Sequence, residues 1–229
     1  MEKETLLDKV TKAITIAGNF IMMNLLFLLA ALPIVTMGQA WSGLVSAIRY
    51  NIRGDKWLDG FKVGYKTRFL RGTVAWCALL LFTVVMAFDI MTYSAVEAFT
   101  AEIIVRLVMS CVMFALVSGL TISFILLNVY IPTETSEWIR NSVNMLFKAP
   151  FQMMVCGVLA WLPVLLAVFY YDIFYYCIMI FVVAYFALAT LIITMLMKDT
   201  LIYFLLEARG AGTLLKTDEN DEEENDGEV

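Results

Sequence analysis

The sequence contains no histidine, and this absence narrows the chemistry open to the protein. Histidine-dependent proteolysis, histidine proton relays and the usual haem and zinc ligation all need an imidazole. The motifs GxxxxGK[ST], GxGxxG, GxSxG and HExxH are also missing, so nucleotide-binding, hydrolase and metalloprotease functions have no support. We therefore expect a protein that is not an enzyme, with no catalytic residue, no cofactor and no bound metal.

Cysteine is scarce and shows no paired spacing. The four cysteines lie inside apolar stretches, and no CxxC occurs among Cys77, Cys111, Cys156 and Cys177. Without such spacing, neither a disulfide framework nor a zinc site is indicated. We interpret the four side chains as small buried hydrophobic groups.

Charged residues are also few. They make up 16% of the 229 residues, whereas 62% are hydrophobic, and a soluble domain is about a quarter charged. Ala13–Ile48 and Ile173–Met197 contain no charged residue at all. Each run exceeds the roughly 20 residues that a helix needs to cross about 30 Å of hydrocarbon. The sequence therefore predicts an all-α, polytopic bundle of transmembrane helices.

The apolar runs divide the chain into five expected spans. They cover Ile14–Val35, Gly72–Ser94, Ile104–Ile131, Pro150–Tyr171 and Ile173–Met197. Residues 36–48 form a further apolar piece, which re-enters the bilayer, lies at the interface or extends the first helix. If this piece crosses the bilayer, there are six spans.

Four residues are expected to break or bend helices: Pro33, Gly38, Pro132 and Pro163. Proline removes a backbone N–H and clashes with the preceding turn. Pro163 lies inside a span, so it should kink the helix unless a neighbouring group satisfies the carbonyl that it leaves unpaired.

Residues 49–71 are strongly basic, with seven lysines and arginines against two acids. Aromatic residues recur every four positions among them, so one helix face is aromatic and the other largely basic. This pattern is typical of an interfacial helix that contacts anionic lipid. Nucleic-acid binding uses the same residue types, but the flanking spans hold this segment at a bilayer. The predicted lipid-contacting residues are Trp57, Phe61, Lys62, Tyr65, Lys66, Arg68 and Phe69.

The positive charges also predict the orientation. Placing residues 49–71, residues 132–150 and the C-terminal tail on one side collects twelve of the sixteen lysines and arginines there. That side is predicted to be cytoplasmic. The three N-terminal lysines then lie outside if the first span crosses once, and inside if residues 36–48 re-enter.

The chain divides into one helical domain, residues 1–217, and an acidic tail. The tail, residues 218–229, holds eight acids and no base, and the rest of the chain is net positive. Such a polar run cannot bury enough apolar surface to offset its ordering entropy, so we expect it to be disordered.

Two charges fall within the expected spans. Asp89 and Arg106 lie on successive helices, both toward the outer end of a predicted hairpin. A charge within the hydrocarbon is costly unless it is paired or reaches the interface. The two residues either form a charge pair lining an outward-facing polar cavity, or they extend separately to the interface.

One stretch carries a family resemblance. Residues 24–48 read NLLFLLAALPIVTMGQAWSGLVSAI, and residues 57–69 read WLDGFKVGYKTRF. With these motifs the chain resembles the YesL-like family of bacterial integral membrane proteins, a family without an established biochemical role. The resemblance implies a bacterial plasma membrane location and an accessory role in carbohydrate uptake or utilisation.

Two functions are open at this point. The first is a non-enzymatic accessory component that binds the bilayer and a membrane partner, such as a sugar-transport system. The second is a small transporter or channel in its own right, which is suggested by Asp89, Arg106 and the proline-interrupted spans at Pro33 and Pro163.

Overall fold

The computed structural model describes residues 6–94, 100–131 and 134–206. Within these ranges the chain is helical and contains no strand. Five segments are long and apolar enough to cross a membrane. The prediction of an all-α polytopic bundle with five spans is therefore confirmed for the described residues. The acidic tail and Pro132 lie outside them.

The candidate spans are formed by long helices, and the shorter helices join them. The spans are α1 (Leu6–Ala31), α4 (Phe69–Ser94), α5 (Ala101–Tyr130), α7 (Pro150–Phe169) and the run of α8 (Tyr171–Ile180), η2 (Phe181–Tyr185) and α9 (Phe186–Leu196). The shorter helices are η1 (Ile34–Thr36), α2 (Met37–Arg53), α3 (Trp57–Lys66) and α6 (Thr135–Lys148).

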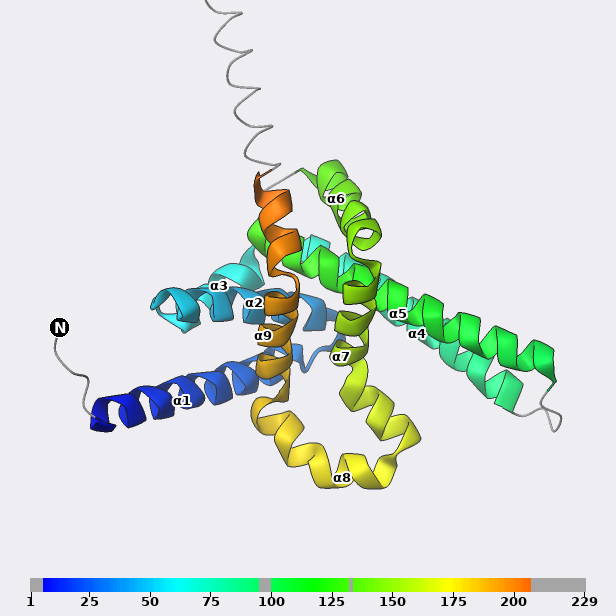
Figure 1. The fold of residues 1–229 in the computed structure, drawn as a ribbon, viewed down its shortest axis with the longest axis horizontal. Coiled ribbons are helices and arrows are strands. Elements are labelled where there is room, and N and C mark those ends of the chain that lie inside the picture. Colours follow the sequence, from blue (N-terminus) through cyan, green and yellow to red (C-terminus); the bar gives the residue numbers. More distant parts are fainter. Residues whose placement is uncertain (1–5, 95–99, 132–133, 207–229) are drawn as a thin grey trace, which may run out of the picture.

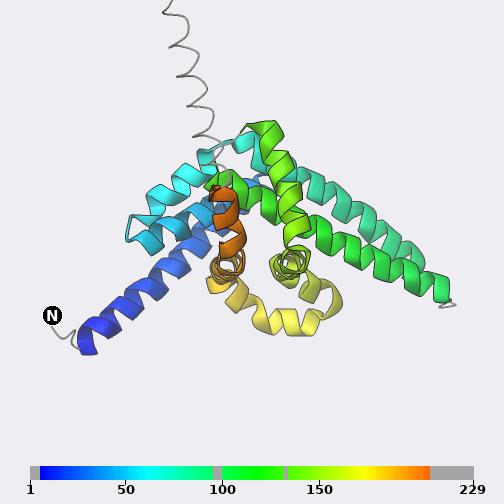
Figure 2. The same cartoon turned by 45° about the horizontal axis from the view of Figure 1, so that its top comes forward.

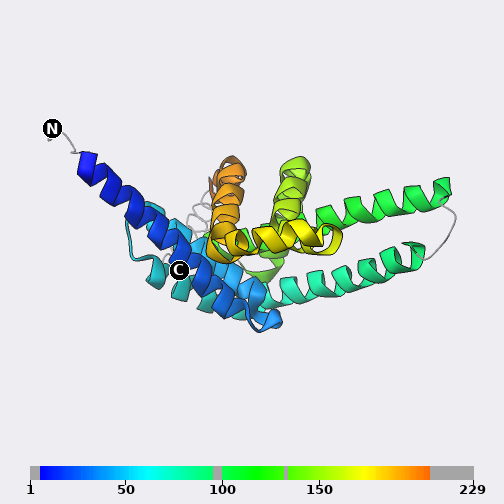
Figure 3. The same ribbon diagram turned by 90° about the horizontal axis from the view of Figure 1, so that it is seen from below.

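The long helices spread outward from one end of the molecule. Figure 1 shows α1 and the α4–α5 hairpin pointing to opposite sides, with α7 and α9 between them. Helix α6 lies at the upper end of this view, and α8 joins α7 to α9 at the lower end. Figures 2 and 3 show the same divergence of α1 from the α4–α5 hairpin. Helix α2 lies where these long helices meet, because it contacts α1, α4, α5 and α9.

The first span ends before Pro33, and the chain then reverses. The hydroxyl of Thr36 donates to the carbonyl of Ala30 over 2.9 Å, which satisfies a carbonyl left open at the end of α1. Helix α2 runs back along α1. Its last turns reach the middle of α1, where Nδ2 of Asn19 donates to Oδ1 of Asn51 over 3.0 Å. Residues 36–48 therefore do not extend the first helix.

Helix α2 is the centre of the fold. All eleven residues from Gly38 to Ile48 are buried. Trp41 packs among rings from two spans, with its centroid 5.9 Å from that of Phe27 on α1 and 6.4 Å from that of Phe186 on α9. A helix buried on every side belongs to a protein core. Other helices therefore shield α2 from lipid.

Gly38 corrects one prediction, because it lies inside α2 and does not break it. A Cβ at Gly38 would lie 2.5 Å from the Cβ of Trp76 and 2.6 Å from the carbonyl oxygen of Gly72, both on α4. The residue therefore permits close helix packing, and the reversal occurs earlier, from Pro33 to Thr36.

The cysteines only partly follow the expectation of burial. Cys156 on α7 is buried and Cys177 is half-buried, whereas Cys77 and Cys111 are exposed. The exposed pair lie on α4 and α5, within candidate spans. An apolar stretch in a membrane protein can face lipid as well as the core, so hydropathy alone did not separate these cases.

Candidate functional site: the basic end and its buried polar contacts

Two arginines of the basic segment turn inward toward the C-terminal end of α5. Nη1 of Arg49 donates to the carbonyl of Val129 over 3.4 Å, and its guanidinium lies 4.8 Å from the ring centroid of Tyr130. Nη1 of Arg68 donates to the carbonyl of Ile131 over 3.1 Å. The last carbonyls of a helix lack intrahelical partners and carry partial negative charge. Both guanidinium groups therefore stabilise the end of α5.

Arg71 makes a similar link to α6. Its Nη2 donates to Oγ1 of Thr135 over 3.0 Å, and its guanidinium lies 5.6 Å from the ring centroid of Trp138. Burial and the nearby charge of Arg71 lower the pKa of Arg68 from its usual value. Arg68 also has a φ of 48°, in the left-handed region that a residue with a Cβ rarely adopts. The junction between α3 and α4 is thus held by contacts with the end of α5 and with α6.

The aromatic face of α3 packs partly on the protein, which corrects the predicted lipid contact at Phe61. Phe61 is buried, and Trp57 and Tyr65 are half-buried against the core. A Cβ at Gly43 of α2 would lie 3.2 Å from the ring of Phe61. Only Phe69 remains exposed. The ring of Phe61, which the sequence placed at headgroup depth, is thus part of the α2–α3 contact.

The lysines of the same segment point the other way. Lys56, Lys62 and Lys66 are exposed. Lys62 and Lys66 line an open hollow of about 430 Å³ together with Val63 and Thr67. The basic segment is therefore divided by residue type, because its three inward cations are arginines and its outward cations on α3 are lysines.

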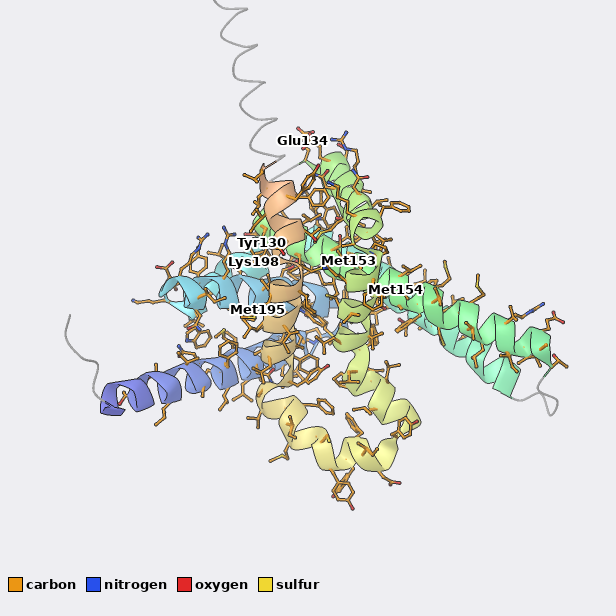
Figure 4. All side chains as sticks on the ribbon, viewed as in Figure 1. Tyr130, Glu134, Met153, Met154, Met195 and Lys198 are labelled. Carbon is orange, nitrogen blue, oxygen red and sulfur yellow. The ribbon has the colours of Figure 1, made fainter. Side chains whose placement is uncertain are left out.

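The chain after α9 reaches this same end. Nζ of Lys148, the last residue of α6, lies 2.9 Å from the ring centroid of Tyr203 and 5.3 Å from that of Phe204. Figure 4 labels Glu134, which precedes α6, and Lys198, which follows α9. We call the described parts of residues 49–71 and 131–148, with residues 198–206, the basic end. Two of the segments that the sequence assigned to one side thus lie together with residues 198–206, and the acidic tail lies outside the described residues.

Gln39 connects α2 to the C-terminal end of α3. Its Nε2 lies within hydrogen-bonding distance of three carbonyls, those of Gly64 at 3.0 Å, Tyr65 at 2.7 Å and Thr67 at 2.9 Å. These carbonyls belong to the end of α3, where intrahelical donors run out. A single buried amide therefore caps the helix that carries the outward lysines.

Asn24 makes a comparable contact in the middle of the first span. Its Nδ2 donates to the carbonyls of Phe181 at 3.2 Å and Val182 at 2.6 Å, and its Oδ1 accepts from the N–H of Ala187 at 3.0 Å. These groups belong to η2 and the start of α9. Because η2 is a π-helix, its hydrogen-bond ladder departs from that of an α-helix. Asn24, which is fully buried, satisfies this irregular backbone.

The same irregular segment also compensates for Pro163. Helix α7 continues through Pro163, and its ribbon changes direction along its length (Figure 1). Pro163 has no N–H to offer the carbonyl of Leu159, four residues earlier. The hydroxyl of Tyr185 in η2 donates to that carbonyl instead. One π-helical segment therefore connects α1 with α7.

Sequence reasoning did not select Asn24, Gln39 or Tyr185 as site residues. A signal was present for the two amides, because Asn24 and Gln39 are polar residues within the long uncharged run of residues 13–48. Polar groups in such a run need partners inside the protein. The partners themselves lie 25 to 163 residues away in the chain, which no local pattern reveals.

The candidate pair of Asp89 and Arg106 stays a prediction. Arg106 forms an ion pair with Glu102, with Nη2 and Oε1 2.8 Å apart, and both side chains are exposed. Asp89 lies in α4, and its side chain is outside the described part of the structure. Among the residues described, no three acidic or cysteine side chains gather as metal ligands.

The fold and these contacts define an all-helical polytopic membrane protein. A family model with the description "Protein of unknown function, DUF624" matches residues 20–90. The matched part includes Asn24, the reversal at Pro33, α2 and the basic segment. No curated protein and no solved structure matches the chain.

Proposed function

We propose that this chain is a non-catalytic accessory protein that binds another membrane protein at its basic end. The observation that carries the proposal is that three polar side chains inside the bundle hydrogen-bond to the protein itself. Asn24, Gln39 and Tyr185 all bond to backbone atoms of other helices. These groups therefore hold the bundle together, while the basic end offers exposed polar surface for recognition.

The outer face of α6 is the proposed contact surface. Trp138, Ser142 and Met145 are buried on its inner face, whereas Ile139 is 47% exposed and Phe147 is 78% exposed. An exposed ring beside charged residues is typical of an interaction surface. Since α6 is short and joins two spans, its outer face is available to a partner at the membrane surface.

The finer assignments rest on sequence. The positive-inside rule supports a cytoplasmic basic end, and the resemblance to the YesL-like family supports a bacterial plasma membrane. The same resemblance supports a role in carbohydrate uptake, with a component of a sugar-transport system as the partner.

Co-purification tests the accessory role. The full chain is cross-linked in membranes, solubilised in several mild detergents and recovered with its bound proteins. We expect a stoichiometric membrane protein with the unaltered chain and loss of that protein with Ile139→Ser and Phe147→Ser together. Exposed Phe151→Ser on α7 is the control and should retain the partner. Recovery of no stoichiometric protein in any detergent would reject the proposal.

A transporter is the second candidate, because α5 carries buried polar atoms without a partner among the described residues. These are Oγ of Ser118 and both amide atoms of Asn128. Unpaired polar groups within a span are costly unless water or a solute contacts them. Proteoliposomes should then show uptake that Asn128→Leu and Asp89→Asn alter. Flux that is equal to that of empty vesicles would exclude this function.

A further inference from the structure

We infer that the outward face of α3 binds the phosphate-bearing headgroups of anionic lipids through Lys56, Lys62 and Lys66. The inference rests on the membrane location and does not require the partner proposed for α6. It adds Lys56 and narrows the prediction from the sequence, in which the lipid-contacting residues are Trp57, Phe61, Lys62, Tyr65, Lys66, Arg68 and Phe69.

The geometry provides a site of suitable form. Lys62 and Lys66 are one helical turn apart, and residues at this spacing are neighbours on a helix surface. Together with Val63 and Thr67 they line the open hollow of about 430 Å³. A phosphate placed there meets two ammonium groups, each a compact charge with three donors.

Three of the arginines of residues 49–71 do not compete for the ligand, because they already bind the protein. Arg49 and Arg68 donate to carbonyls of α5, and Arg71 donates to α6. Guanidinium groups suit such directed contacts, whereas lysines are flexible and strongly hydrated. Among the described side chains of α3, Asp59 is the one acid, and it lies in the first turn. The outward face therefore keeps a net positive charge.

The apolar side chains beside the lysines favour a lipid as the occupant. Val63 is 50% exposed and Leu58 is 42% exposed, between the lysines of α3. The candidate span of α4 begins at Phe69, three residues after Lys66. A lipid fits both features, since its phosphate meets the lysines while its acyl chains meet apolar side chains and the span.

The test uses the full chain in a neutral detergent, titrated with short-chain phosphatidylglycerol or phosphatidylcholine. Binding is read as the rise in the thermal unfolding midpoint. We expect phosphatidylglycerol to stabilise the protein more than phosphatidylcholine does. Lys62→Gln with Lys66→Gln should weaken phosphatidylglycerol binding roughly thirtyfold, since each lysine near a headgroup contributes about 1 kcal/mol. Lys62→Arg with Lys66→Arg should retain it.

Three controls separate the alternatives. Arg53→Gln with Lys198→Gln removes the same charge from exposed positions outside α3 and should leave binding unchanged. Equal weakening by this pair would overturn the site. Inorganic phosphate at millimolar concentration should give no stabilisation, and an effect as large as that of the lipid would replace the lipid with a free anion. No preference for phosphatidylglycerol would also overturn the inference, whatever the result of the α6 experiment.

Discussion

Asn24 is a polar residue in the centre of a candidate span, and its contacts explain why it is tolerated there. Its amide bonds to three backbone groups of η2 and α9 and is completely buried. An amide exposed to hydrocarbon would be unfavourable, whereas an amide paired inside the bundle joins two helices. The residue therefore couples α1 to the last span.

We predict that Asn24→Leu destabilises the protein. The substitution keeps a similar volume but leaves the irregular carbonyls of η2 without a donor, at a cost of about 1–3 kcal/mol. The measurement is the unfolding midpoint in detergent. Asn144→Leu, at an exposed position of α6, is the control and should change the midpoint little. Equal midpoints for the two variants would show that the bonds add no stability.

Glycines at helix contacts give a second prediction at this scale. A Cβ at Gly64 would lie 2.5 Å from the Cβ of Ser46 and 2.6 Å from the carbonyl oxygen of Ser42. Gly64→Ala should therefore separate α3 from α2 and cost about 1–3 kcal/mol. At Gly18 nothing lies within 4 Å of the added methyl, so Gly18→Ala should be neutral or slightly stabilising. Monomer remaining after heating, followed by size-exclusion chromatography, compares the two variants.

At the scale of helices, a residue of η2 replaces the hydrogen bond that α7 loses at its proline. Pro163 leaves the carbonyl of Leu159 without its helical donor, and Tyr185 replaces that donor. A π-helix often marks a place where a helix adapts to its surroundings. Here the widened turn of η2 carries both Tyr185 and the carbonyls that Asn24 satisfies.

A double-mutant cycle tests this link. Tyr185→Phe alone should cost about 1 kcal/mol, because the carbonyl of Leu159 loses its donor. In a Pro163→Ala background the restored N–H of residue 163 satisfies that carbonyl, so Tyr185→Phe should cost much less. The free energy of unfolding in a denaturing detergent titration gives both values. If the two costs are equal, the hydroxyl does not compensate for Pro163.

The short helices α2, α3 and α6 set the arrangement of the basic end. Helix α2 supplies a buried surface of small residues on which α3 packs closely, as at Gly64. Arg49, Arg68 and Arg71 then connect this pair to α5 and α6. The elements between the spans are therefore structural parts of the fold rather than simple connections.

For the whole molecule, these contacts gather most of the described cations at one end of a set of diverging spans. Figure 1 shows α6 at this end and the C-terminal end of α4 and the N-terminal end of α5 far from it. A membrane protein keeps such cationic segments on the cytoplasmic side. The two ends of the α4–α5 hairpin should therefore be accessible from opposite sides of the membrane.

Labelling of single cysteines tests this orientation. In a chain with the four native cysteines replaced by alanine, a membrane-impermeant maleimide is applied to intact cells. Thr100→Cys, at the start of α5, should be labelled from outside. Ser136→Cys, exposed on α6, should be labelled only after the cells are opened. The reverse result would place the basic end outside and contradict the proposed topology.

The sequence by itself determined the class of the protein, its five candidate spans and the break of the first helix near Pro33, whereas the reversal of the chain after that break came from the structure. These features depend on local properties, because the length of an apolar run and the position of a proline act within one or two helical turns. It also predicted that the basic segments share one end, since charge placement follows the count of crossings.

Only the tertiary structure decided which way the side chains of each helix point and what they contact. It made α2 the buried centre, turned Phe61 and three of the arginines inward, and left Lys62 and Lys66 outside. An amphipathic pattern states that a helix has two faces, but the neighbours available to each face decide which one is buried. The bonds of Asn24 likewise depend on residues more than 150 positions away.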